Sequence, residues 1–288
     1  MNKITKCPCC LSNNFKIVLF IDNKNIKNFK SLDKKYYNNF LISVMNTDNI
    51  KIAKCLECFH HWYLYQPNDQ KLEFMYTNKK IKDNIKSQHK ENIKKNILIL
   101  KKISPGKDLL DFGSGLNNIW EEIATKNKFK YYGYDPFLQK KRNLKNYFNS
   151  IDELKDKKFD VINVNQVLEH VKDLDETLES IKKFCKKDTI LKISVPNILR
   201  PREKLMKNFY HEWPYNKKSL HTMSPFEHLH GFSAKSLKLL FLRKNFLIKH
   251  SFKIFFFFNH FYIRQYFNNY FPLLSTTEMI FKFNTKNK

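Results

Sequence analysis

Four of the six cysteines fall into two pairs in which two residues separate the partners. Cys7 and Cys10 form the first pair, and Cys55 and Cys58 form the second. C-x-x-C pairs in a cytosolic chain predict metal-binding thiolates rather than disulfides. Four thiolates on two tight turns match the tetrahedral coordination of Zn²⁺, and metal binding would also fold the segment. We therefore expect structural zinc at these four cysteines, with reduced thiols that carry no metal as the alternative.

Neighbouring residues offer other ligand sets. Cys9 lies inside the first pair and could compete with Cys10 or pack in the interior. His60 and His61 follow the second pair and could replace a cysteine, although an aromatic-rich strand over residues 59–65 accounts for them without a metal. The four paired cysteines remain the expected ligands.

The elements that must position these cysteines form a small N-terminal unit. Short strands are predicted over Phe15–Ile21 and Leu41–Met45, so residues 1–75 are expected to be a zinc-stapled β module resembling a zinc ribbon. A metal staple explains how so few residues can fold. Residues 76–105 are polar and lysine-rich with apolar residues at helical spacing, which predicts a helical bridge. A proline–glycine pair then precedes the main domain, which we place at residues 106–288.

Two of the five glycines stand in one short turn. Asp108–Phe112 is predicted to be an apolar strand, Gly113–Gly115 a turn, and residues 117–126 a helix. Glycines at this position let the backbone pass close to a ligand at the mouth of a parallel sheet. The next strand, Tyr131–Asp135, ends in a carboxylate that can accept hydrogen bonds from both hydroxyls of a ribose. This order of elements predicts a nucleotide-type cofactor.

The same alternation continues along the chain. Residues 159–164 are predicted to be a strand, residues 174–184 a helix with leucine and isoleucine on one face, and residues 189–195 another strand. Strands that alternate with helices favour a doubly wound α/β fold with a parallel sheet.

These segments resemble the class I S-adenosylmethionine-dependent methyltransferases. Asp108–Gly115 (DLLDFGSG) is similar to the glycine-rich first motif of that family, and Phe159–Val171 (FDVINVNQVLEHV) to its fourth motif and the following L-E-H-V. Asn117 stands where the family usually has a third glycine. The resemblance implies a Rossmann-like, mostly parallel seven-stranded sheet with helices on both faces, and S-adenosylmethionine as cofactor. The cofactor-binding residues that it implies are Asp111, Gly113, Ser114, Gly115, Asp135, Pro136, Asn165 and Gln166.

A long excursion at residues 196–232 is the expected acceptor region. Near its end Glu227 precedes His228, and an acid beside an imidazole can serve as a base with an orienting partner. The stretch PFEHLHGFS, together with the cysteine module, resembles the nucleotide-sugar C-methyltransferases, in which a Glu-His pair and an upstream tyrosine line the sugar site. The resemblance implies that Glu227, His228 and Tyr76 are catalytic, whereas His170 in L-E-H-V is expected to be structural.

The net charge of +26 raises the question of a nucleic-acid partner. Only five of the 53 basic residues are arginine, and the lysines are spread over the whole chain, which favours a solvated surface over a focused polyanion site. The phenylalanine-rich stretch at residues 247–283 is expected to be core, with an apolar acceptor site or a membrane-surface contact as the alternative. No apolar leader precedes the cysteines and no run is long enough for a bilayer, so we expect a cytoplasmic protein.

Three functions follow in order of preference. The first is methyl transfer from S-adenosylmethionine to a small molecule, which we expect to be a sugar or a nucleotide-sugar. The second is an RNA methyltransferase in which the zinc module and the basic surface bind nucleic acid. The third is a zinc-ribbon binding protein with an inactive methyltransferase domain, against which the retained Asp111, Gly113, Gly115 and Asp135 speak.

Overall fold

The computed structural model describes residues 2–22, 25–37, 42, 50–68, 72, 87–115, 119–137, 146–198, 213, 222–225, 227–249 and 276–283. Tyr76, Asn117 and the phenylalanine run at 255–258 lie outside these ranges. The strand expected at residues 41–45 also lies outside them, apart from Ile42, which is helical.

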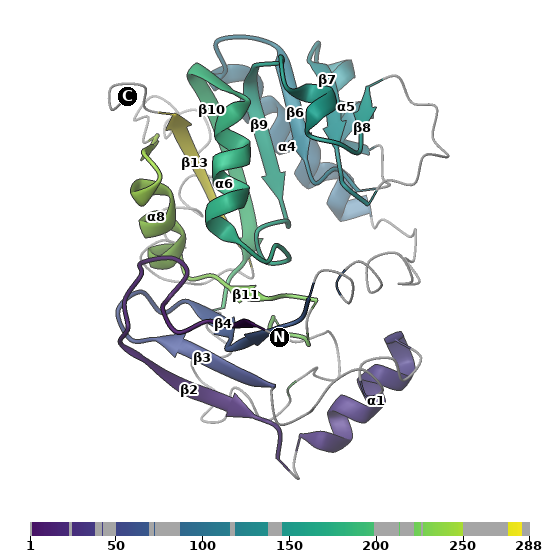
Figure 1. The fold of residues 1–288 in the computed structure, drawn as a ribbon. Coiled ribbons are helices and arrows are strands. Elements are labelled where there is room, and N and C mark those ends of the chain that lie inside the picture. The colour runs from purple at the N-terminus through teal and green to yellow at the C-terminus, as the bar shows by residue number, and fades with distance from the viewer. Residues whose placement is uncertain are drawn as a thin grey trace.

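A seven-stranded sheet forms the larger half of the molecule (Figure 1). Its strand order is β12-β13-β10-β9-β6-β7-β8, and the run from β10 to β8 is parallel, whereas β13 is antiparallel to both of its neighbours. The expected mostly parallel seven-stranded α/β sheet is therefore confirmed. The strands are β6 (Asp108–Phe112), β7 (Lys130–Tyr134), β8 (Tyr147–Phe148), β9 (Phe159–Asn165), β10 (Cys185–Pro196), β12 (Phe246–Ile248) and β13 (Thr276–Phe283).

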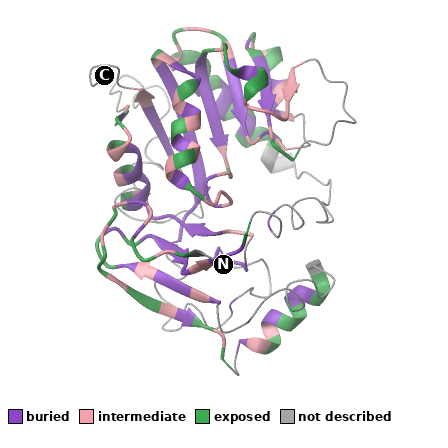
Figure 2. Ribbon diagram, in the orientation of Figure 1, coloured by how far each residue is buried: buried purple, intermediate pink, exposed green. Residues whose placement is uncertain are grey.

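Helices cover both faces of this sheet, and the alternation of side chains along each strand explains why. Leu109 and Val161 pack in one core cluster with residues of α4 (Ser87–Ile103) and α5 (Ile119–Lys126). Their sequence neighbours Leu110 and Ile162 point to the other face and pack with α6 (Leu174–Lys183) and α8 (Ala234–Arg243). Figure 2 shows that the central strands are buried along almost their whole length, as expected for a sheet covered on both sides.

Side-chain caps begin the two helices of the second face. The Asp173 carboxylate accepts hydrogen bonds from the backbone N–H groups of Asp175 and Glu176, at 2.8 and 3.0 Å. Ser233 and Ser236 form a reciprocal capping box at the start of α8. Serine suits the N-cap position because its hydroxyl can accept a hydrogen bond from a backbone N–H of the first turn.

A second, four-stranded sheet lies beyond the carboxyl edge of the first (Figure 1). Its antiparallel order is β11-β4-β3-β2, and β11 comes from a segment far along the chain. A two-stranded ladder and helix α1 (Ile26–Tyr37) accompany it, and Phe29 of α1 stacks on Trp213 with ring centroids 6.2 Å apart. The strands of the four-stranded sheet are β2 (Phe15–Phe20), β3 (Lys51–Cys55), β4 (His61–Tyr63) and β11 (His230–Gly231), and those of the two-stranded ladder are β1 (Asn2–Lys3) and β5 (Tyr65–Gln66).

Arg243, at the end of α8, ties the N-terminal cysteine turn to the larger sheet. Its guanidinium donates to the backbone carbonyls of Pro8 (2.9 Å) and Cys9 (3.3 Å), and to both carboxylate oxygens of Asp175 (2.8 and 2.6 Å). A planar guanidinium suits four acceptors of this kind. Ser233 adds a second tie through its hydroxyl, which donates to the Cys58 carbonyl at 2.6 Å.

In the part of the chain that the structure describes, no helix is long and apolar enough to cross a bilayer.

Replacing Arg243 by lysine tests this tie. An ammonium group cannot reach the carbonyls and the carboxylate at once, so we expect Arg243→Lys to lower the free energy of unfolding by about 2 kcal/mol, the scale of one charged hydrogen bond. Urea denaturation measures the change, and Lys238→Ala on the exposed side of α8 is the matched control. Equal unfolding free energies for the two variants would contradict the assignment.

Candidate functional site

The glycine turn after β6 has the backbone conformation that its residue types allow. Gly113 and Gly115 have positive φ angles of 78° and 60°. A Cβ on Gly113 would lie 2.3 Å from Val167 Cγ2, whereas a Cβ on Gly115 would meet nothing within 4 Å among the described residues. Gly113 is therefore required by packing, while Gly115 faces space that a ligand can enter. The N–H groups of Gly113 and Ser114 both donate to the Tyr134 carbonyl, at 2.7 and 3.0 Å.

Asp135 follows the end of the neighbouring strand β7 and closes on the glycine turn. Its Oδ2 accepts a hydrogen bond from Gly115 N and its Oδ1 from Phe137 N, both at 2.9 Å. Burial raises the pKa of the carboxyl, and the two N–H groups oppose that shift. Each carboxylate oxygen can accept a further hydrogen bond, so this acid can still receive two hydroxyls. Pro136 follows it at the surface.

Asp111 lies inside the sheet, with 2% of its surface exposed. Its carboxylate accepts hydrogen bonds from the Tyr131 hydroxyl (2.8 Å) and from Asn163 Nδ2 (2.7 Å). Burial still raises the pKa of Asp111 to about 6. Sequence reasoning did not assign these two partners. For Asn163, the pairing of β6 with β9 explains the contact, because the parallel register places Asn163 directly opposite Asp111.

The end of β9 adds Asn165 and Gln166 to the same edge. Gln166 takes a positive φ of 56°, and its backbone N–H donates to the Ser194 carbonyl at 2.8 Å. The chain then turns through Val167, which contacts Gly113, before α6 begins. The ends of β6, β7 and β9 thus lie together, as parallel strands with right-handed crossovers require.

Glu227 and His228 lie against the turn that follows β9. The backbone carbonyl of Glu169 accepts hydrogen bonds from Leu229 N (2.7 Å) and His230 N (3.2 Å). The imidazoles of His170 and His228 pack edge to face, with centroids 4.7 Å apart. His228 Nδ1 is 2.8 Å from the Thr222 carbonyl oxygen, and His170 Nδ1 contacts the Glu227 carbonyl.

Sequence reasoning missed Glu169, which lies at the centre of this group. Its side chain is 1% exposed, and neither carboxylate oxygen has a hydrogen-bond partner among the described residues. Burial raises the pKa of Glu169 to about 8, and the charge of nearby Glu227 adds to the shift. The sequence feature that could have pointed to Glu169 is an acid inside the apolar stretch V-L-E-H-V, because burying a charged residue there costs free energy.

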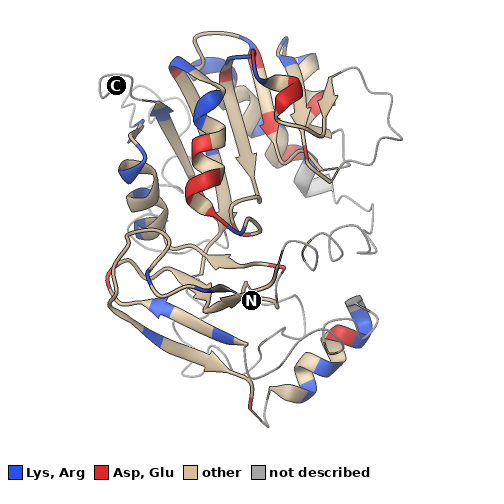
Figure 3. Ribbon diagram, viewed as in Figure 1, with Lys and Arg blue, Asp and Glu red and all other residues tan. Residues whose placement is uncertain are grey.

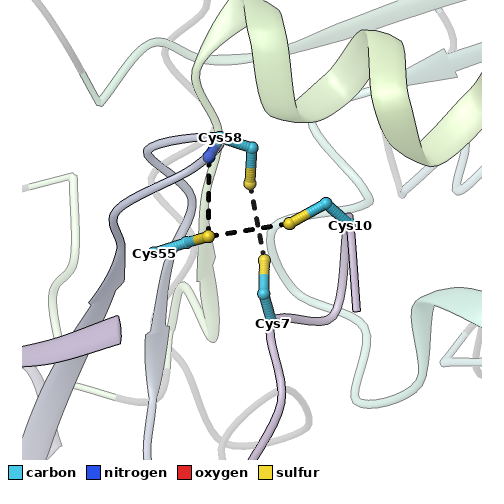
Figure 4. A group of neighbouring side chains, drawn as sticks. All are labelled: Cys7, Cys10, Cys55 and Cys58. Carbon is cyan, nitrogen blue, oxygen red and sulfur yellow. Dashed lines mark hydrogen bonds between the residues drawn. The ribbon is translucent and has the colours of Figure 1, made fainter. Parts of the chain in front are cut away.

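The four paired cysteines converge in space, although the two pairs are far apart in the sequence (Figure 4). Their sulfur atoms all lie within 4.8 Å of one another; Cys7 Sγ is 3.5 Å from Cys58 Sγ, and Cys10 Sγ is 3.6 Å from Cys55 Sγ. None of the four forms a disulfide. A tetrahedral zinc with Zn–S bonds of about 2.3 Å separates its sulfurs by about 3.8 Å, so the cluster fits that ion.

Both cysteine turns have the same backbone geometry. Leu11 and Phe59 each follow the second cysteine of a pair and take positive φ angles of 63° and 62°. Cys9 points elsewhere: it is fully buried, and desolvation raises its pKa well above the usual value. His60 also lies outside the cluster, with its Nε2 3.2 Å from His230 Nδ1. His61 Nδ1 contacts the Phe59 carbonyl at 3.0 Å.

Comparison with known proteins gives a family match. The family model described as a methyltransferase domain matches residues 85–251, which is more than half of the chain. No curated protein matches this chain.

Several solved structures have a similar outline at low sequence identity. The plantazolicin methyltransferase BpumL in complex with SAH is 14% identical over 76% of this chain and 91% of its own, with a TM-score of 0.44. A SAM-dependent methyltransferase from Archaeoglobus fulgidus is 16% identical over 75% of this chain and 100% of its own, with a TM-score of 0.41. Magnesium protoporphyrin IX methyltransferase (ChlM) from Synechocystis PCC 6803 is 12% identical over 76% and 90%, with a TM-score of 0.41.

The family match covers the glycine turn, the β9 edge and the Glu-His segment, which are the parts that make up the site. By that match the chain belongs to the methyltransferase domain family and is an S-adenosylmethionine-dependent methyltransferase of the class I fold.

Proposed function

We propose that this enzyme methylates a small-molecule acceptor, and that the acceptor is a sugar or a nucleotide-sugar. The observation that carries the proposal is the turn between β9 and α6. At one end Val167 contacts Gly113 of the glycine turn, and two residues later Glu169 holds the segment of Glu227 and His228. A methyl donor on one side and an acceptor on the other would meet across this turn, as an in-line displacement demands.

The glycine turn and the adjacent strand ends form the proposed cofactor site. Asp135 would accept the ribose hydroxyls, because its carboxylate is held at the strand end beside Gly115. Gly115 leaves space for the ligand, and the buried Asp111 would support the turn on the side of the cofactor's amino-acid end. The full proposed set is Asp111, Gly113, Ser114, Gly115, Asp135, Pro136, Asn165 and Gln166.

Proton removal from the acceptor is assigned to the Glu227–His228 segment. The Thr222 carbonyl faces His228 Nδ1, so Nδ1 is a donor, and in the neutral ring Nε2 then has the lone pair that a base needs. Tyr76 belongs to the same proposal and lies outside the described residues.

The N-terminal unit would support the acceptor segment through structural zinc at Cys7, Cys10, Cys55 and Cys58. We keep the division into a zinc module at 1–75, a helical bridge at 76–105 and a methyltransferase domain at 106–288. The role of the zinc module in holding the acceptor segment is supported by the small sheet, in which β11, directly after that segment, pairs with β4. Basic residues are spread over helices and strands and mix with acids on α6 (Figure 3), which favours a small molecule over RNA as the acceptor.

Removing the Asp135 carboxylate tests the cofactor site. We expect Asp135→Ala to weaken S-adenosylhomocysteine binding on the order of 100-fold, because two charged hydrogen bonds to the ribose are lost. Calorimetric titration measures the dissociation constant, and the exposed Asp156→Ala is the control for loss of one negative charge. Wild-type affinity in the Asp135 variant would contradict the ribose assignment.

Substitutions in the acceptor segment test the catalytic assignment. Glu227→Gln and His228→Ala should leave S-adenosylhomocysteine affinity unchanged and reduce turnover by about 10²–10⁴, the usual contribution of a positioned base. The assay follows S-adenosylhomocysteine release with a panel of nucleotide-sugars, and Lys238→Ala is the control. Full activity of both variants on an accepted substrate would place the acceptor site elsewhere.

Metal analysis tests the cysteine module. We expect the Cys7→Ser variant to hold one zinc fewer per chain than the wild type, because three thiolates bind the ion less tightly than four. Elemental analysis after gel filtration gives the ratio. Cys185→Ser changes a buried cysteine outside the cluster and should keep the wild-type zinc content. The same zinc content in all three proteins would refute the four-cysteine site.

A further inference from the structure

Three potential metal ligands meet beyond the end of β9, away from the cysteines. Glu169, His170 and His228 each contribute one ligand atom, and these atoms all lie within 4.8 Å of one another. Glu169 Oε1 is 3.9 Å from His170 Nε2. The three residues come from two segments that the Glu169 carbonyl joins through hydrogen bonds to Leu229 and His230, so their proximity is built into the backbone.

Both imidazoles are oriented by backbone carbonyls. His228 Nδ1 lies 2.8 Å from the carbonyl oxygen of Thr222, and His170 Nδ1 contacts that of Glu227. A carbonyl can only accept, so Nδ1 carries a proton in each ring, and in the neutral ring Nε2 has the lone pair. A metal-binding histidine typically has this arrangement, in which the far nitrogen donates to a carbonyl or carboxylate and fixes the tautomer.

The Glu169 carboxylate provides an independent indication of a ligand. Its side chain is 99% buried, and neither oxygen has a hydrogen-bond partner in the described part of the chain. An unpaired buried carboxylate is costly, and nearby Glu227 adds a second acid rather than a compensating base. Among the described residues no lysine or arginine forms an ion pair with Glu169. A bound cation would supply the missing partner.

We propose that Glu169, His170 and His228 bind one divalent transition-metal ion at a site separate from the four-cysteine cluster. One carboxylate and two imidazoles suit zinc, manganese, iron or cobalt better than calcium or magnesium, which prefer oxygen ligands alone. Bonds of about 2.1 Å bring such ligand atoms to about 3.0–3.4 Å of one another, so binding draws the three side chains together. Three protein ligands leave coordination positions open, as in catalytic metal sites.

The site deepens the proposed function, and its catalytic consequence rests on that function. An acceptor oxygen that fills an open position would be fixed near the methyl donor and would lose its proton more easily. With an ion bound, the Nε2 lone pair of His228 would be taken up by the metal, so within the Glu227–His228 segment the role of proton acceptor would pass from His228 to Glu227. The acceptor class narrows accordingly to compounds with a hydroxyl or similar oxygen at the atom that is methylated or next to it.

Cobalt binding to the full-length protein tests this proposal without any acceptor. Protein with a zinc-filled cysteine cluster is freed of weakly held metal with a mild chelator and titrated with Co²⁺ by calorimetry and visible absorption. We expect one equivalent of Co²⁺ to bind without the thiolate charge-transfer bands of a cysteine site. Glu169→Gln and His228→Asn should each weaken Co²⁺ binding on the order of 100-fold.

Two controls make the result specific. Glu227→Gln removes a neighbouring negative charge outside the ligand set and should keep Co²⁺ binding within a few-fold of the wild type. S-adenosylhomocysteine affinity, measured on every variant, shows that the fold is intact. The proposal is overturned if the zinc-loaded wild type binds no Co²⁺, or if Glu169→Gln binds it as tightly as the wild type. Neither result would bear on the proposed methyl transfer, because that function is tested separately by S-adenosylhomocysteine release.

Discussion

The backbone carbonyl of Glu169 accepts two hydrogen bonds, from Leu229 and His230, and much of the site depends on this contact. It joins the turn after β9 to a segment that lies some way further along the chain. On one side the turn packs on Gly113, and on the other the segment continues into β11 of the small sheet. The glycine turn, the Glu227–His228 segment and the small sheet are thus joined by one short stretch of backbone.

Two buried acids, Asp111 and Glu169, differ in how the cost of their burial is offset. Asp111 receives hydrogen bonds from Tyr131 and Asn163, so its burial is compensated within the sheet. Glu169 is as deeply buried and has no such partner among the described residues. A fold tolerates an uncompensated carboxyl of this kind where a ligand completes it, and the ligand atoms of Glu169, His170 and His228 all lie within 4.8 Å of one another.

The cysteine cluster belongs to the same architecture. Both of its turns end in a left-handed residue, and Arg243 and Ser233 bind their carbonyls from the helix face of the larger sheet. Holding these turns together fixes β3 and β4, and β4 in turn pairs with β11. A metal at the cysteines would therefore stiffen the strand that follows Glu227 and His228, although the cluster itself is separate from them.

The sequence alone determined the α/β class, the strand and helix of the glycine turn and the C-x-x-C pairs, because these depend on local periodicity and on residue types with few conformational options. It did not determine that β11 completes the N-terminal sheet, that Arg243 clasps the first cysteine turn, or that Glu169 faces His228. Those contacts join segments far apart in the chain, and only packing of the whole chain brings such segments together. Local propensities carry no information about that pairing, so the environment of Glu169 was decided by the tertiary structure.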